Sequence, residues 1–451
     1  MLAGAAMWGF TVDDALISVR YARHVAHGVG YRFNAEGPST DGVTPLPWPF
    51  LLAALSIGAD ALSTLVRAKV LGLLAWGGSA FLLGRAVARV DAHDGVRVMA
   101  LVTLGLCLPV AAHSVSGMET GVVLALATGA AVVERAWLAA LLAGLAAAFR
   151  PELVPWALAL GVGRSLALDE GRKAALRAGA VALGPPLLVA VARLVVFGRA
   201  APLAVLAKPA DLSQGGAYVV VGMLVALTPL LVVSLALLRA GGRPRALAVA
   251  ALVHALAVVA AGGDWMPYAR LLAPIAPGLL LAFVESSPKV PRWSLGSRWA
   301  LSVALGVYLV GKAAPAGRHV MEDRRALVVE ATPMLASYKH VAAVDVGWVS
   351  AATEADVVDL AGLTDLSVAV LPGSHTSKRV DPSMLLDRKV DAILFYVERP
   401  VPEGTWRDVV YPHSVDTRLA RSDLFAEHYA PVGFLPLGRE GRGYVVLAAR
   451  P

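Results

Sequence analysis

Apolar runs of near-membrane length recur from residue 1 to about residue 311 and then stop, and this pattern constrains the fold more than any other feature. Hydrophobic residues make up 57% of the chain and charged residues 16%, whereas soluble globular proteins average about 25% charged residues. Mean hydropathy is +0.66. The sequence therefore predicts a polytopic α-helical membrane protein.

The apolar runs predict the membrane helices individually. We expect spans near 67–88, 97–112, 120–134, 137–149, 153–163, 178–197, 216–238, 246–261, 269–285 and 299–311. With a first apolar run at 1–12, this makes about eleven helices. That first run is too short to cross about 30 Å of hydrocarbon, so we expect a stub helix or a late sequence start. No signal-peptide cleavage site follows it.

Two short features interrupt this regular series. The spans 137–149 and 153–163 are expected to form a helical hairpin with a polar elbow at 150–152. The apolar segment 48–61 is also too short to cross a membrane, so we expect a juxtamembrane or re-entrant helix.

Positive charge orients the spans, because cytoplasmic loops carry an excess of Lys and Arg. One set of alternate loops carries this excess: Arg85, Arg89, Arg97, Arg135, Arg164, Arg172, Lys173, Arg177, Arg239, Arg243, Arg245, Lys289, Arg292 and Arg298. The other set contains the unusual polar sequences and everything after the last span. We therefore expect one extracytoplasmic site, built from several loops of a bacterial inner-membrane protein.

Residues 312–451 alternate charged and apolar residues and predict a small extracytoplasmic α/β domain, distinct from a catalytic membrane domain at 1–311. Strands are expected at 341–347, 357–363, 391–397 and 443–450. We expect this domain to lie over the outer cavity and to bind an acceptor glycan, with His375 in the polar loop 372–378 as a candidate contact. The alternative is a stabilising cap without a ligand.

Several function classes are excluded by missing motifs. The single cysteine, Cys107, excludes an intramolecular disulfide and a cysteine-rich metal site. No Walker loop or Gly-rich phosphate loop follows a strand, so a nucleotide donor is not expected, and there is no nucleic-acid signature. No strong metal site is predicted, although adjacent carboxylates at Asp13 and Asp14 could hold a divalent cation.

The stretch 13–48 contains the densest group of functional candidates. Asp13 and Asp14 open a helix whose cations fall within roughly a 100° arc, and glycines end it at Gly28 and Gly30. The cations are Arg20, Arg23, His24 and His27. Such a helix can lie flat on a membrane, and acids beside cations suit chemistry on a lipid phosphate. The alternative is that the acids only cap the helix.

Further polar residues lie at the predicted outer ends of spans: Glu119, Arg150, Glu152, Lys208, Asp264 and Arg270. Each has a structural alternative, such as a helix N-terminal acid at Glu119, mutual pairing of Arg150 with Glu152, or a snorkelling arginine at 270. Together they predict an outer cavity whose cations stabilise a phosphate leaving group and whose acids accept a hydroxyl proton.

The same stretches carry a family resemblance. DDALISVRYARHVAHGVGYRFN followed by DGVTPLPW resembles the first outer loop of GT-C glycosyltransferases, membrane enzymes that use polyprenyl-phosphate sugars. SGMET, RPE, PLAVLAK, GGDWMPYAR and DVGWVSAATEADVVDLAGLTD are similar, in order, to further patterns of the group that contains the mycobacterial terminal β-(1→2) arabinofuranosyltransferase. The chain departs from that group in lacking a tyrosine within DGVT and an asparagine-threonine pair at 202–208.

The resemblance implies a glycosyltransferase that moves a sugar, with inversion, from a polyprenyl phosphate to an envelope glycan, lipid or protein. It implies that Asp13 is the general base with Asp14 in support, and the alternatives for this base are Asp14, Glu119 and Asp264. We expect Arg20, Arg23, Arg150, Lys208 and Arg270 to bind the lipid phosphate. The rival functions are a polyprenyl-lipid transporter, which should show inverted repeats, and a non-catalytic envelope scaffold.

The topology is tested with reporter fusions. A reporter active only outside the cytoplasm should be active when it follows the C-terminal domain, because the basic loops all fall on the opposite side. The same reporter inserted in the basic loop after Glu170 should be inactive. Activity of a cytoplasm-only reporter at the C-terminus would contradict the predicted topology.

Overall fold

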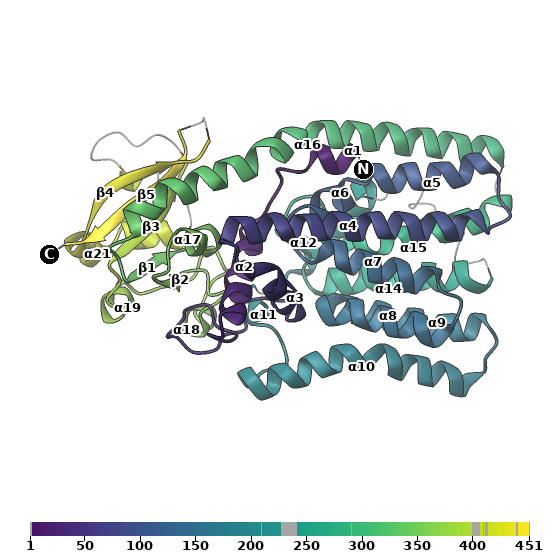
Figure 1. Cartoon of the computed structure of the whole chain (residues 1–451), viewed down its shortest axis with the longest axis horizontal. Helices are drawn as coiled ribbons and strands as arrows, with labels where there is room; N and C mark the ends of the chain where they lie inside the picture. The colour runs from purple at the N-terminus through teal and green to yellow at the C-terminus, as the bar shows by residue number, and fades with distance from the viewer. Residues whose placement is uncertain are drawn as a thin grey trace. The chain divides into compact units, whose positions relative to one another are not determined.

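The computed structural model describes residues 2–208, 210–226, 241–289, 291–398, 406–408, 410, 414–438 and 441–450. Part of the predicted span 216–238, from residue 227 on, lies outside these residues, as does Arg239. The chain forms two compact units (Figure 1). The first, here called the helical unit, comprises 1–11, 67–192 and 210–318; the second, here called the sheet unit, comprises 12–66, 193–209 and 319–451.

Helices build nearly all of the helical unit. Its elements, some of which continue into the sheet unit, are α1 (Leu2–Ala6), α4 (Ala61–Ala88), α5 (Asp94–Leu106), α6 (Leu108–Ser114), α7 (Thr120–Val132), α8 (Ala136–Phe149), η1 (Pro151–Leu153), α9 (Val154–Ala167), α10 (Arg172–Phe197), α12 (Leu212–Ala226), α14 (Gly242–Ala260), η3 (Arg270–Ile275), α15 (Ala276–Ser286), η4 (Ser287–Lys289) and α16 (Arg292–Leu335).

Four of the described helices are long and apolar enough to cross a membrane: α4, α10, α14 and α16. The bent pair α5 and α6 makes a fifth if it is counted as one span. By length and composition these helices indicate a multi-pass membrane protein. The described parts of the other predicted spans also lie in helices, but α7 and α8 have 13 and 14 residues. At 1.5 Å per residue such helices are shorter than about 30 Å of hydrocarbon.

Proline positions explain where the apolar runs break. Pro109 lacks an N–H and its ring clashes with the preceding turn, so the predicted span 97–112 divides at Cys107 into two helices bent by 51°. The predicted hairpin is confirmed: α8 and α9 pack together on either side of η1, which begins at Pro151. The helix predicted to end at 311 instead continues to Leu335 as part of α16.

Small residues let these helices approach closely. A Cβ on Gly121 of α7 would lie 2.5 Å from the carbonyl oxygen of Gly72 in α4. A Cβ on Gly144 of α8 would lie 2.5 Å from the carbonyl oxygen of Ala182 in α10. Such contacts replace the hydrophobic driving force that helices lack within a lipid environment.

The sheet unit combines the first polar stretch with the C-terminal region. Its elements are α2 (Asp13–Ala26), α3 (Pro47–Ser56), α11 (Leu203–Ala207), β1 (His340–Ala343), α17 (Val346–Ala352), β2 (Asp356–Asp359), α18 (Leu366–Ala369), α19 (Pro382–Asp387), β3 (Ala392–Val397), η5 (Trp406–Asp408), α20 (Val415–Ala420), α21 (Asp423–His428), β4 (Tyr429–Pro436) and β5 (Gly443–Ala449).

The described strands form one mixed sheet in the order β2-β1-β3-β5-β4 (Figure 1). The first three strands are parallel, and β5 pairs antiparallel with both β3 and β4. The predicted strands at 391–397 and 443–450 match β3 and β5, whereas those at 341–347 and 357–363 end early, and β4 was not predicted. Val341, Ile393, Phe395 and Leu447 lie in the buried centre of the sheet.

Charges on α2 contact both ends of α17. Asp13 accepts hydrogen bonds from the N–H groups of Gly347 (2.6 Å) and Trp348 (2.9 Å), at the start of α17. Arg20, two turns further along α2, donates to the carbonyls of Ser350 (3.0 Å) and Thr353 (2.8 Å) at its end. A carboxylate at a helix N-terminus and a cation at its C-terminus both complement the helix dipole. Asp13 therefore caps α17 rather than its own helix.

A substitution at Gly347 tests the contact between α2 and α17. A Cβ there would lie 2.1 Å from the backbone oxygen of Asp13 and 2.6 Å from its Oδ2. Gly347→Ala should therefore lower the free energy of unfolding by about 1–3 kcal/mol, measured by thermal or denaturant unfolding in detergent. Gly78→Ala is the control, because a Cβ at Gly78 meets no atom within 4 Å. Equal stability of both variants would contradict the close contact between α2 and α17.

Candidate functional site

Charged residues from three parts of the helical unit lie together. Glu119 precedes α7, Arg150 and Glu152 occupy the elbow between α8 and α9, and Asp264 and Arg270 flank the loop before η3. The elbow forms because Pro151 interrupts the helix there, and the backbone leaves α8 at Arg150 in an extended conformation. We call these five residues the ionic cluster.

Arg150 lies between two carboxylates. Its Nη1 is 2.8 Å from Oε1 of Glu119, and its Nε is 2.7 Å from Oε1 of Glu152. The Glu119 side chain is 0% exposed and the Arg150 side chain 6% exposed, so both charges are removed from solvent. The predicted alternative that Arg150 pairs with Glu152 is thus confirmed, and Glu119 is added as a second partner.

A second ion pair joins Arg270 to Asp264, with Nε and Oδ2 2.7 Å apart. The loop that contains Asp264 has unusual backbone geometry: Gly262, Gly263, Tyr268 and Ala269 all have positive φ values. For Tyr268 and Ala269 this conformation is strained, because a Cβ disfavours the left-handed region. Strain of this kind concentrates at functional sites.

Two buried histidines contact backbone carbonyls around the ionic cluster. His254 of α14 contacts the carbonyl of Glu152 through Nδ1 (3.3 Å) and that of Leu271 through Nε2 (2.8 Å). His113 of α6 contacts the carbonyl of Pro267 through Nε2 (2.9 Å). The sequence reasoning missed both histidines. The signal that could have found them is an ionisable residue inside an apolar run, which is costly without a function.

The ionic cluster contains three carboxylates and two guanidinium groups, and Asp264 also acts electrostatically on Arg150. Two of its polar atoms, Nη1 of Arg270 and Oε2 of Glu119, are buried without a hydrogen-bond partner among the described residues. Buried polar groups are normally hydrogen-bonded, so each of these atoms has capacity for one further hydrogen bond, to water or to a ligand. One is a cationic donor and the other an anionic acceptor.

In the sheet unit, the two adjacent acids differ sharply. Besides capping α17, Asp13 accepts a 2.8 Å hydrogen bond from Nη1 of Arg324. Burial raises the pKa of Asp13 to about 6, with the Arg324 cation opposing the shift. Asp14 is half-buried, and no hydrogen bond or ion pair of its carboxylate is found within the described part of the chain. Asp14 is therefore the more accessible carboxylate.

The predicted cations of the sheet unit also differ. Arg20 is buried, and besides Ser350 and Thr353 its guanidinium donates to the carbonyls of Phe33 (2.7 Å) and Ala355 (2.8 Å). Arg23 forms a 3.2 Å ion pair with the exposed Glu354. Lys208 follows α11 and is half-buried, as is His375 in the loop after α18. A phosphate contact by Arg20 would require it to release these carbonyls.

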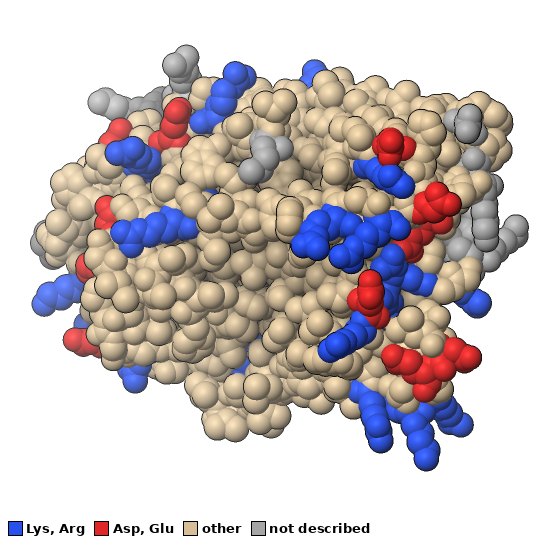
Figure 2. All heavy atoms as spheres, turned by 45° about the vertical axis from the view of Figure 1, so that its right-hand side comes forward, with Lys and Arg blue, Asp and Glu red and all other residues tan. Residues whose placement is uncertain are grey.

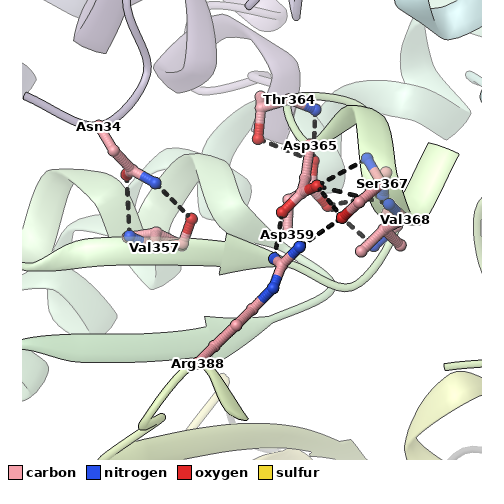
Figure 3. Close-up of polar contacts among 10 residues, drawn as sticks. Asn34, Val357, Asp359, Thr364, Asp365, Ser367, Val368 and Arg388 are labelled. Carbon is pink, nitrogen blue, oxygen red and sulfur yellow. Dashed lines mark hydrogen bonds and ion pairs between the residues drawn. The ribbon is translucent and has the colours of Figure 1, made fainter. Parts of the chain in front are cut away.

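The sheet unit also contains a cavity of about 750 Å³ between the loop after α2 and the sheet edge at β2. Figure 3 shows Asn34 of that loop hydrogen-bonded to both backbone groups of Val357 in β2. Arg388 points toward Asp365 and Ser367, and its Nη1 lies 2.5 Å from Oδ2 of Asp365. Carboxylate, hydroxyl and guanidinium groups thus line one side of the cavity.

Within the described residues, no group of three or more His, Cys, Asp and Glu side chains is placed to hold a metal ion. The chain matches no protein-family model, and neither the curated proteins nor the solved structures contain a match. The function of this chain is therefore inferred from its own residues and from the resemblance in its sequence.

The burial of the ionic cluster predicts that the protein loses stability when Arg150 is replaced. Arg150→Gln should lower the free energy of unfolding by about 3–5 kcal/mol, because it leaves the buried Glu119 without its cation. Arg89→Gln is the control: its pair with Glu134 is mostly exposed, so its loss should cost less than about 1 kcal/mol. Thermal unfolding in detergent distinguishes the two, and similar midpoints would contradict the burial of the cluster.

Proposed function

We propose that the chain is a membrane glycosyltransferase. It transfers a sugar from a polyprenyl phosphate to an acceptor of the cell envelope, on the extracytoplasmic side of a bacterial inner membrane and with inversion. The observation that supports this most is the ionic cluster: buried charges in the helical unit, with an unpartnered cationic donor beside a strained loop. The sequence resemblance to GT-C enzymes supplies the donor class.

The cluster supports this reaction through charge. When the bond between the anomeric carbon and the phosphate oxygen breaks, the electron pair leaves with the lipid phosphate. Nη1 of Arg270 can donate a charge-assisted hydrogen bond to that phosphate, and such bonds are strong in a partly dry site. Arg150 stays a predicted phosphate contact, and Glu119 and Glu152 already neutralise it and hold it in position.

The acceptor hydroxyl must lose its proton as its oxygen bonds to the anomeric carbon. We propose that Asp14 takes this proton and that Asp13 is a positioning residue, which reverses the order expected from the sequence. Asp13 is already engaged by Arg324, Gly347 and Trp348, whereas a base needs a lone pair within reach of the hydroxyl. Glu119 and Asp264 remain alternatives, although each is paired with an arginine.

The acceptor is assigned to the sheet unit. Its cavity beside β2 is of the size of a small-molecule site and presents polar groups suited to sugar hydroxyls. The rival assignments are a polyprenyl-lipid transporter and an envelope scaffold. A scaffold would tolerate loss of the acids, and a transporter would move the lipid-linked sugar without consuming it.

Lipid-linked sugar profiling of a deletion strain tests the proposal. The unused polyprenyl-phosphate sugar should accumulate, and the wild-type gene should restore its normal level. Asp14→Asn should not restore it, because asparagine accepts no proton; we expect transfer to fall roughly a hundredfold or more while donor binding is retained. Asp13→Asn should instead reduce the amount of folded protein, because it removes the charge paired with Arg324.

The control is Asp60→Asn. Asp60 accepts a hydrogen bond from the N–H of Ser63 at the start of α4, a role that asparagine performs as well. Normal transfer by Asp14→Asn would remove Asp14 from the mechanism. An unchanged donor level in the deletion strain would contradict the transferase proposal itself.

A further inference from the structure

The ends of α4, α7 and α8 line a second, open cavity of about 560 Å³ on the surface of the helical unit. Its lining combines cations with an apolar surface: Arg85, Arg89 and Arg135 on one hand, and Leu82, Val132 and Leu138 on the other. None of these residues belongs to the ionic cluster. We call this cavity the arginine pocket.

The fold explains why these residues meet. Gly72 of α4 lies against Gly121 of α7, and both helices continue from that contact to end near the pocket. A buried arginine holds the turn between α7 and α8: Nη2 of Arg164 donates to the carbonyls of Val133 (2.5 Å) and Glu134 (3.3 Å). Helix packing and hydrogen bonds therefore fix the backbone of the pocket, and this backbone carries the three pocket arginines.

The pocket has an excess of positive charge. Glu134 is the one acidic residue among its described lining residues, and its Oε1 lies 3.8 Å from Nη1 of Arg89. Both of these side chains are mostly exposed, at 82% and 66%, so their pairing is weak. Figure 2 shows Lys and Arg side chains gathered, with some acids among them, on the side of the surface that carries the right-hand helix ends of Figure 1.

Apolar side chains next to the pocket stand exposed. Phe81 of α4 is 63% exposed, and Trp137 of α8 is 52% exposed. Exposed aromatic residues near the ends of membrane helices are typical of the interface between hydrocarbon and headgroups. A soluble anion would use only the arginines, whereas a lipid would use both the arginines and the apolar surface.

We propose that the arginine pocket binds the headgroup phosphate of an acidic phospholipid, whose acyl chains lie along α4 and α8 beside Phe81 and Trp137. Guanidinium groups bind phosphate oxygens in a bidentate geometry, and basic pockets between membrane helices select anionic headgroups. This site is independent of the proposed transfer reaction and requires only that the helical unit lies in a membrane.

Native mass spectrometry of the full-length protein tests this site. The protein is released from detergent micelles that contain equal amounts of phosphatidylglycerol and phosphatidylcholine, and retained lipids are counted. The wild type should retain phosphatidylglycerol preferentially. The double variant R85Q/R135Q should retain it roughly tenfold less, because each arginine near an anionic headgroup contributes to binding. Arg172 and Arg177 are exposed and lie outside the pocket, so R172Q/R177Q is the charge-matched control and should behave as the wild type.

A variant that is expected to retain more lipid controls for misfolding, because a misfolded protein would retain less. Glu134→Gln removes the pocket's acid and should raise phosphatidylglycerol retention severalfold. Equal losses in both double variants would show a general charge effect and overturn the proposal, as would a wild type without preference. Displacement of the lipid by free glycerol phosphate would also overturn it, because the site would then recognise only the anion.

Discussion

The contact between α2 and α17 is the interaction on which the sheet unit depends. A helix as short as Val346–Ala352 leaves most of its N–H and C=O groups without partners inside the helix, so it is marginal alone. Asp13 supplies acceptors at its start, and Arg20 supplies donors at its end. Because these contacts join residues more than 300 positions apart, the first polar stretch and the C-terminal region form one compact unit.

In the helical unit the corresponding constraint is the cost of burying charge. Each buried ion requires a partner, and the ionic cluster satisfies this with two arginines and three carboxylates. Replacing such a network with apolar residues is often neutral or stabilising, so stability alone does not explain it. The strained backbone at Tyr268 and Ala269 lies beside the cluster, where we propose that a charged ligand binds.

Much of the fold could be predicted because apolar runs and prolines act locally. The helices at the predicted spans, the elbow at Pro151 and the central strands β3 and β5 all follow from hydrophobicity and breakers. Strand β4 could not be predicted, because Pro431 and Gly433 have low strand propensity. Its extended conformation depends on pairing with β5, a contact that local sequence does not indicate. For the site, the sequence identified the five residues of the ionic cluster. It did not identify His113 and His254, which contact backbone carbonyls around the cluster.

The sequence by itself determined the class of protein, the positions of its helices and the ionisable residues at their ends, since these depend on neighbours along the chain. Only the tertiary structure decided the partner of each charge. Asp13 opens α2 but caps α17, across 334 residues, and Arg20 binds carbonyls rather than solvent. Local periodicity places a charge on a helix face, but the partner depends on which element packs against that face, and long-range packing decides this.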